Sequence, residues 1–298
     1  MRIRVAQPDD AADVVALRAV VHPYLVRGVE STRKMIAEPP PHDGWTAFVA
    51  EVDGQLVGWT SAEPNASTSV QGFGDVNMLH VHPERRRSGI GAALLTAAID
   101  HLRLLGVRRV RTMATADSLP FARRHGFTPS REVRYSALDL NPPPALPEPP
   151  PGVRLRPVAE LDPRLLYEAD VASALDEPGD VPVDAVTFEN WRYDVWDNLG
   201  LDKAASTATE VDGDVAAFSL VKRDGARMWS DYTCSVPAYR GRGLARMAKT
   251  AALHRAAEDG VRIAYTSNDE SNAPMLAINA RLGYRPVASQ WTCLADVS

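Results

Sequence analysis

Two short segments of the chain combine arginine with glycine in a pattern that suits a phosphate ligand. They run Arg86-Arg87-Ser88-Gly89-Ile90-Gly91 and Arg240-Gly241-Arg242-Gly243-Leu244-Ala245. Each leads into an alanine-rich stretch with helical periodicity. Glycines at the opening turn of a helix let backbone amides approach an anion, and the helix N-terminus adds positive partial charge. Because arginine adds a fixed charge, each segment predicts a loop that holds a pyrophosphate.

Two other interpretations of these loops compete with this one. A dinucleotide-binding fold also places glycines between a strand and a helix, and a solvated surface turn can have the same composition. The arginines before the glycines and the lack of a Gly-x-Gly-x-x-Gly run argue against the dinucleotide fold. One copy would favour phosphate binding over a surface turn only modestly, whereas two copies in equivalent places favour it strongly.

The elements expected around the two loops occur in the same order in both halves of the chain. Each half opens with an apolar strand and a helical pattern, followed by a hairpin with an Asp-Gly turn. The long helix behind each loop should end at a glycine, the usual left-handed cap, equally far from the first arginine. The paired signals are residues 2–7 and 153–156, Asp53-Gly54 and Asp212-Gly213, and Gly106 and Gly260. Order, spacing and residue type therefore predict an internal duplication.

A proline-rich stretch separates the two halves. Residues 141–152 contain seven prolines in twelve positions, and proline disfavours both helix and interior strand. We expect a stiff linker there, an N-terminal domain over 1–140 and a C-terminal domain over 153–298. The expected fold is α/β (α+β): two tandem domains, each a mixed, mainly antiparallel sheet flanked by helices.

The bulk composition excludes several classes of protein. The 298 residues are 45% hydrophobic, enough for two domain cores, and the net charge of −5 argues against a nucleic-acid partner. The two cysteines imply no disulfide framework, and no Cys/His cluster has the spacing of a metal site. No apolar run suits a signal peptide or a membrane span, so a cytoplasmic location is expected.

The doubled loop resembles the acyl-CoA loop of the GCN5-related N-acetyltransferase (GNAT) family. This resemblance covers nearly the whole chain outside the linker, and the tandem layout is similar to that of two-domain acetyltransferases of the mycothiol synthase type. It implies acetyl-CoA as co-substrate, with its pyrophosphate on the loop amides and its pantetheine arm beside the preceding strand. By this resemblance, the coenzyme-binding residues are Leu79, His80, Val81, Arg86, Arg87, Ser88, Gly89, Ile90 and Gly91 in the first half, and Thr233, Cys234, Ser235, Val236, Arg240, Gly241, Arg242, Gly243, Leu244 and Ala245 in the second.

The stretch 266–284 of the second half matches a further signature of the family. By resemblance, Asn272 would contact the pantetheine arm and Asn268 would organise the end of the preceding strand. Either asparagine could instead cap a helix without touching a ligand. The matching stretch of the first half lacks both asparagines. We therefore expect its arm-binding segment to be poorer.

Acetyl transfer to an amine needs a base for the ammonium group and a donor for the developing oxyanion. Asp231, on the strand before the second loop, is the candidate base or amine anchor, although a structural carboxylate is an equal alternative. Its counterpart in the first half is Asn77, which cannot act as a base. Many family members have a tyrosine that acts as a general acid four residues before the glycine of the last helix. Here those positions hold Ala122 and Asn279, so Tyr265 is a weak substitute.

These features favour an N-acetyltransferase whose C-terminal domain acts on the primary amine of a small molecule. A catalytic N-terminal domain and a non-catalytic acyl-CoA sensor or scaffold stay open as alternatives. The acceptor could contact the aromatic and acidic segment 188–197, although the spacing of Trp191 and Val195 fits a core better. We expect no metal, no membrane and no nucleic acid, and either a monomer with a pseudo-twofold repeat or a homodimer.

Overall fold

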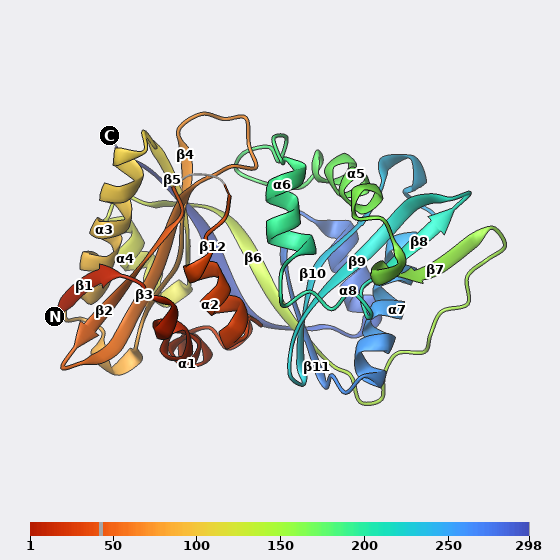
Figure 1. Ribbon diagram of the computed structural model, residues 1–298, viewed down its shortest axis with the longest axis horizontal. Helices are drawn as coiled ribbons and strands as arrows, with labels where there is room; N and C mark the ends of the chain where they lie inside the picture. The colour runs from red at the N-terminus through yellow and green to blue at the C-terminus, as the bar shows by residue number, and fades with distance from the viewer. Residues whose placement is uncertain (42–43, 298) are drawn as a thin grey trace. The chain divides into compact units, whose positions relative to one another are not determined.

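The computed structural model describes residues 1–41 and 44–297. Contacts divide the chain into two compact units. The first unit comprises Met1–Val133 together with the C-terminal residues from Ser289 onward, and the second comprises Arg134–Ala288. Figure 1 labels the elements of both units.

The first unit is a sheet covered by helices. Its strands are paired in the order β1-β2-β3-β4-β5-β12, and β6 lies beyond β12. The pairs β1–β2, β2–β3, β3–β4 and β5–β12 are antiparallel, and β4 with β5 is parallel. The elements are β1 (Arg2–Val5), α1 (Ala11–Val21), α2 (Val29–Ala37), β2 (Thr46–Val52), β3 (Gln55–Pro64), β4 (Phe73–Val81), α3 (Ile90–Leu104), β5 (Arg109–Ala114), α4 (Leu119–Arg124) and β6 (Thr128–Asp139).

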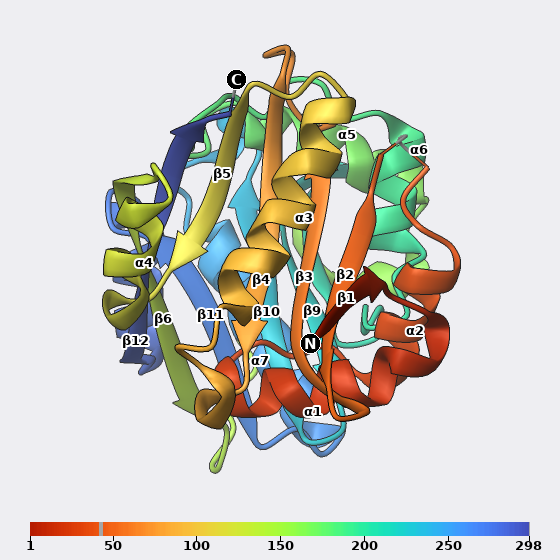
Figure 2. The same ribbon diagram turned by 90° about the vertical axis from the view of Figure 1, so that its left-hand side faces the viewer.

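Alternation along the strands of the first unit supplies two apolar faces. Val49 packs with Val14 and Leu17 of α1, whereas its neighbour Ala50 packs with Ile90 and Leu94 of α3. Successive strand residues point to opposite faces, so α1 and α3 cover opposite sides of the sheet. Figure 2 shows α3 lying across one of these faces.

The second unit repeats this plan with its own elements. Its strand order is β6-β11-β10-β9-β8-β7, and β10 with β11 is again the parallel pair. The elements that follow β6 in the chain are β7 (Val153–Pro157), α5 (Pro163–Ala174), α6 (Phe188–Trp191) continued by a π-helical turn (Arg192–Trp196), β8 (Thr207–Val211), β9 (Asp214–Asp224), β10 (Arg227–Ser235), α7 (Leu244–Glu258), β11 (Ile263–Asp269), α8 (Ala273–Leu282) and β12 (Arg285–Asp296), of which β12 belongs to the first unit from Ser289 onward. The predicted α/β class with a mixed sheet is confirmed.

The turn and cap residues read from the sequence adopt the conformations that were expected. Asp53 and Asp212 both have a φ of about +54°, and each is followed by a glycine with positive φ, as a tight hairpin requires. Gly106 and Gly260 follow α3 and α7 with φ of 76° and 94°. Residues 141–152, all within the described part of the chain, form neither helix nor strand.

The last strand of the chain does not stay with the half of the sequence that contains it. Residues 291–296 of β12 pair antiparallel with 109–114 of β5, in the first unit. In the second unit, β6 takes the place beside β11. The compact units therefore differ from the sequence boundaries 1–140 and 153–298. The physical reason is that each sheet closes its open edge with a strand from the other half of the sequence.

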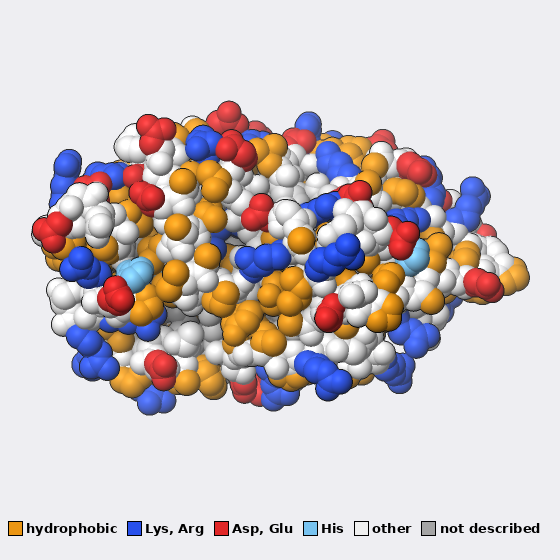
Figure 3. All heavy atoms as spheres, turned by 90° about the horizontal axis from the view of Figure 1, so that it is seen from below, with side chains coloured by type: hydrophobic (Ala, Val, Ile, Leu, Met, Phe, Trp, Pro, Cys, Tyr) orange, Lys and Arg blue, Asp and Glu red, His pale blue; other side chains and the backbone are white. Residues whose placement is uncertain are grey.

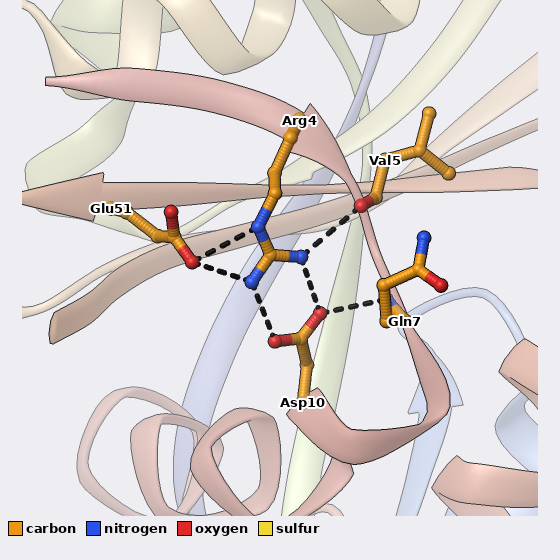
Figure 4. A network of polar contacts seen from close by, with 5 residues as sticks. All are labelled: Arg4, Val5, Gln7, Asp10 and Glu51. Atoms are coloured by element: carbon orange, nitrogen blue, oxygen red, sulfur yellow. Dashed lines mark hydrogen bonds and ion pairs between the residues drawn. The ribbon is translucent and has the colours of Figure 1, made fainter. Parts of the chain in front are cut away.

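An ion-pair network ties β1 to the helical turn that follows it. The Arg4 guanidinium donates to both carboxylate oxygens of Asp10, at 2.7 and 2.8 Å, and to Oε1 of Glu51 on β2 (Figure 4). The backbone N–H of Gln7 also donates to Asp10, at 2.7 Å. In the second unit Arg156 on β7 contacts Glu210 and Glu160 in the same way. The duplication thus extends to this network.

We expect Asp10→Asn to lower the free energy of unfolding by about 1–2 kcal/mol at neutral pH, because it removes charge-assisted hydrogen bonds from a largely buried carboxylate. Hydrogen bonding to Arg4 lowers the pKa of Asp10. The contribution is therefore full above the unfolded-chain pKa of about 4 and disappears as the pH falls through the lower folded pKa. Urea unfolding between pH 3 and 7 measures this difference. Glu160→Gln, at the more exposed network of the second unit, should cost less at every pH.

Candidate active site

The two predicted loops have the same backbone conformation. Each follows a strand and a short 3₁₀ turn and ends where a long helix begins, at Ile90 and Leu244. The left-handed positions are Arg87 (φ 63°) and Gly89 (φ 84°) in the first loop, and Gly241 and Gly243 (φ 75° each) in the second. Arg87 therefore adopts, as a non-glycine residue, a conformation that the second loop gives to glycine.

The first arginine of each loop is fixed to the end of its strand. Arg86 Nε donates to the carbonyl of Val81, and Arg240 Nε donates to that of Ser235, both at 3.2 Å. Arg240 also forms an ion pair with Asp176, whereas Arg86 has no such pair among the described residues. The guanidinium groups therefore lie beside the opening turn, where the helix N-terminus also favours an anion.

Space lies directly above these turns. A Cβ atom built on Gly89, Gly241 or Gly243 would meet no other atom within 4 Å. Residues 85–89 and 240–243 are exposed. The loops therefore fit an anionic group of the size of a pyrophosphate in both charge and access.

The strand before each loop separates from its parallel neighbour. Pairing of β4 with β5 runs from Phe73 to Val76, and pairing of β10 with β11 runs from Arg227 to Trp229. Each strand then continues to the loop without that partner. A register shift follows, opposite residues 59–61 in the first unit and between Ser230 and Thr233 in the second. Such a bulge bends the strand and leaves backbone groups unpaired.

The residues predicted to line the coenzyme arm lie on these separated strands. Leu79 lies within the bulge of β4, and His80, Val81 and residues 233–235 follow the bulges. Val236 begins the turn into the second loop. The His80 side chain is 7% exposed, and the Cys234 side chain packs against the apolar cluster that contains Leu166 of α5. Burial raises the pKa of the Cys234 thiol, which does not suit a nucleophile.

The two asparagines of the second unit occupy different positions. Asn272 is the N-cap of α8, where its Oδ1 accepts from the backbone N–H of Met275 at 3.3 Å. Asn268 Oδ1, at the end of β11, accepts from Nδ2 of Asn279 at 2.6 Å. The capping alternative is thus observed for Asn272, and its contact with the coenzyme stays a prediction.

The two predicted catalytic residues do not lie together. Asp231 lies in the bulge of β10, where its Oδ2 is 2.8 Å from Nζ of Lys222 and its side chain is 22% exposed. Tyr265 pairs with Trp229 before the strands separate, and its ring lies 5.3 Å from the Arg227 guanidinium. Asp231 therefore lies where β10 has separated from β11, whereas Tyr265 lies in the part of β11 that is still paired with β10.

A carboxylate that the sequence did not reveal lies close to the point where β10 separates from β11. Asp170 on α5 accepts a 2.6 Å hydrogen bond from the indole N–H of Trp191. Burial raises its pKa to about 7, the Trp191 hydrogen bond opposes that shift, and the charge of Asp231 adds to it. Burial raises the pKa of the Tyr232 phenol, in the bulge of β10, and the charge of Asp170 adds to that shift. Asp170 shares the buried face of α5 with Leu166, Ala169 and Ser173. An acidic residue at a helix position that should face the core was therefore the pattern by which the sequence could have identified it.

The aromatic segment after α5 is mainly core. Trp191 is 3% exposed and stacks against Phe188 and Trp196. The core interpretation of Trp191 is confirmed, and its polar contribution to the site is the hydrogen bond to Asp170.

The matching region of the first unit has the opposite electrostatic character. His80 on β4 takes the place of Cys234, and its ring centroid lies 5.9 Å from that of His22. Burial lowers the pKa of His80 to about 3 and that of His22 to about 4, and the nearby Arg18 acts in the same direction. The first unit therefore places neutral imidazoles and a guanidinium where the second places carboxylates.

In residues 1–41 and 44–297, no three His, Cys, Asp or Glu side chains gather as a candidate metal site. Over the same residues, no helix combines the length and apolar character that crossing a bilayer requires. On the face drawn in Figure 3, basic and acidic side chains are interspersed rather than gathered into one basic field.

Two units that each carry a separated parallel strand pair, a bulge and an arginine–glycine loop define a duplicated acyl-CoA-dependent acyltransferase fold. The model of the Acetyltransferase (GNAT) family matches the chain twice, over residues 18–127 and 170–284. The chain belongs to this family. It is an N-acetyltransferase with acetyl-CoA as its co-substrate.

Known relatives match the chain over most of their length. The mycothiol acetyltransferase of Amycolatopsis mediterranei is 30% identical over 267 residues, which is 83% of this chain and 83% of that protein. That of Stackebrandtia nassauensis is 29% identical over 266 residues, 86% of this chain and 81% of the relative. Among solved structures, a tandem GNAT protein from the clavulanic acid biosynthesis pathway matches with a TM-score of 0.77 at 22% identity, over 100% of this chain and 98% of that one. This last likeness concerns the fold.

The loops can be tested one at a time with a matched pair of variants. Gly91→Glu and Ala245→Glu each place a carboxylate in the first turn of the helix behind the loop. A carboxylate there favours the helix but repels a pyrophosphate. We expect each to weaken CoA binding at its own site by about tenfold or more, about 1.4 kcal/mol. Calorimetry with CoA on each single variant and on the double variant measures this. Gly91→Gln and Ala245→Gln control for bulk, and binding unchanged in the double variant would contradict the assignment.

Proposed function

We propose that the second unit transfers the acetyl group of acetyl-CoA to the primary amine of a small molecule. The observation that carries this proposal is the placement of Asp170 and Asp231 beside the separated strands of that unit. A cationic amine is attracted by carboxylates and must lose a proton before it attacks a thioester. The arginine and neutral histidines of the first unit offer neither attraction nor an anionic base.

Asp170 is the best candidate for the base. Its raised pKa of about 7 makes the carboxylate basic enough to accept a proton near neutral pH while leaving much of it ionised. Asp231, held by Lys222, adds negative charge close by and suits an anchor for the ammonium group. A backbone N–H in the bulge after Ser230 is the candidate donor to the oxyanion.

A small acceptor agrees with the relatives. The first relatives matched over most of the chain are named mycothiol acetyltransferases, a name that refers to a small molecule and not to a protein acceptor. At about 30% identity the same acceptor does not follow for this chain. The acceptor is therefore proposed at the level of a small primary amine.

The first unit is proposed to bind acyl-CoA without transferring its acyl group. It keeps the loop, the bulge and the separated strands, and it has Asn77 where the second unit has Asp231. Release of free thiol with a panel of amines, measured on Gly91→Glu and Ala245→Glu, assigns the active unit. Turnover that survives Ala245→Glu but not Gly91→Glu would transfer the activity to the first unit. CoA binding without turnover on any amine would favour a sensor.

We expect Asp170→Asn to lower kcat/KM for the amine by about 100-fold or more, because an amide cannot accept the proton. In the native protein the rate should rise with pH through about 7, as Asp170 loses its proton, and this acidic limb of the pH profile should vanish in the variant.

Trp191→Phe removes the hydrogen bond that lowers the Asp170 pKa, so the acidic limb of the pH profile should move to higher pH.

Glu168→Gln is the matched control for this substitution. It makes the same change of carboxylate to amide on the same helix, at an exposed position. Its pH profile should equal that of the native protein. An unchanged acidic limb in Asp170→Asn would exclude Asp170 as the base.

A further inference from the structure

A lysine is buried in the core of the second unit. Lys249 lies on α7, one helical turn after Ala245 of the loop and on the same face of the helix. The residue is 1% exposed, and Nζ lies 5.0 Å from the centroid of the Tyr284 ring. Burial alone lowers the pKa of Lys249 to about 7. No carboxylate or imidazole on the described elements packed around α7 is close enough to shift it further.

Polar groups without hydrogen-bond partners lie in the same core. The hydroxyls of Ser230 and Tyr284 are neighbours, yet both are buried and neither has a partner in hydrogen-bond geometry among the described residues. Oδ1 of Asn279 is buried and unpartnered as well. Buried polar atoms in native proteins usually have a partner, so these atoms indicate an ordered water or another small polar occupant.

The first unit builds the same core from apolar side chains. Thr112 Oγ1 donates to the carbonyl of Val76 in the first unit, and Thr266 Oγ1 donates to that of Ser230 in the second, which fixes the correspondence. Leu95 follows Gly91 by one turn, as Lys249 follows Ala245. Phe127 follows the glycine after α4, as Tyr284 follows the one after α8. The residues Val76, Leu95, Ala114, Ala122 and Phe127 form one apolar cluster. They correspond to Ser230, Lys249, Asn268, Asn279 and Tyr284.

Stability does not explain the polar residues Ser230, Lys249, Asn268, Asn279 and Tyr284, here called the polar set. A hydroxyl buried without a partner and an amine buried in a core both cost free energy, and apolar replacements of similar size are often more stable. This fold tolerates the apolar version, because the first unit contains it. The polar set must therefore contribute something other than stability to the second unit.

The place of the set indicates its use. Ser230 is the residue after the last parallel pair of β10, where the strands begin to separate. The set therefore borders the place where the coenzyme sulfur becomes a thiolate if, as proposed above, the second unit is catalytic.

We propose that Lys249, acting through the hydroxyls of Tyr284 and Ser230 and a water held between them, supplies the proton that the leaving thiolate of CoA takes up. After Asp170 has taken one proton from the ammonium group, the amine nitrogen bonds to the carbonyl carbon. The carbon–sulfur bond breaks, its electron pair stays on sulfur, and the nitrogen releases a second proton to solvent. The sulfur receives a proton from the hydroxyl chain, which Lys249 restores from its ammonium form. Asp170 holds the proton lost by the substrate amine and returns it through solvent to Lys249. The sum is acetyl-CoA and an ammonium ion giving an amide, CoA thiol and one proton.

Lys249 is thus a positioning residue, and its removal should act on the ionisation of the thiol more than on binding. The first measurement needs no acceptor amine. In a Gly91→Glu background, which leaves the second loop, thiolate absorbance of bound CoA is followed against pH. We expect the bound thiol to have a pKa lower than free CoA by about one unit or more, and Lys249→Met to remove most of this shift.

The second measurement is the pH profile of turnover. The native protein should lose activity above pH 7 as Lys249 loses its proton, and this basic limb should be absent in Lys249→Met. The same variant should lower kcat by about 100-fold with little change in KM for acetyl-CoA. Tyr284→Phe should lower kcat similarly while Lys249 is still present.

Lys249→Leu, which copies Leu95 of the first unit, guards against misfolding and should melt at a higher temperature than the native protein. An unshifted thiol pKa in the native protein, or a basic limb that survives in Lys249→Met, would overturn the proposal. A shifted thiol pKa without turnover on any amine would support the role of Lys249 and contradict the proposed acetyl transfer. Normal turnover with no effect of Lys249→Met would support the proposed acetyl transfer and contradict the role of Lys249.

Discussion

Each unit depends on a parallel strand pair that is hydrogen-bonded for only part of its length. β4 and β10 leave their partners after Val76 and Trp229, and a bulge follows in each. Backbone donors and acceptors that a complete ladder would consume are then free for a ligand. The loop and the helix behind it extend this set of backbone donors with an N-terminal dipole. A backbone arrangement of this kind needs few particular side chains, and both units keep it.

The side chains around that shared backbone have diverged. Arg86 and Arg240 keep the same hydrogen bond to the strand end, and Arg4 and Arg156 keep the same ion pairs. The differences concentrate on both sides of the separated strands. One side has carboxylates in the second unit and imidazoles in the first, and the other side has a polar core in the second unit and an apolar one in the first. Duplication with divergence at these places suits one unit that reacts and one that binds.

The sequence was sufficient for the features that local chemistry determines. The loops, the Asp-Gly turns, the glycine caps and the linker depend on φ, on proline and on helix-terminal charge, and the structure and the family match agree with them. Strand exchange was not predictable, because β6 and β12 have similar patterns and either could close either sheet. Asp170 was missed because its partner Trp191 is 21 positions away. Lys249 was passed over because a lysine in a helix normally faces solvent.

The exchanged strand affects how the protein is made. β5 of the first unit acquires its antiparallel neighbour from residues 291–296, which leave the ribosome only after the whole second unit has been synthesised. Until then the edge of β5 lacks that partner, and an unpaired edge readily joins strands of other chains. The two units are consequently interdependent in biosynthesis, and separating them at the proline-rich linker would leave each without its closing strand.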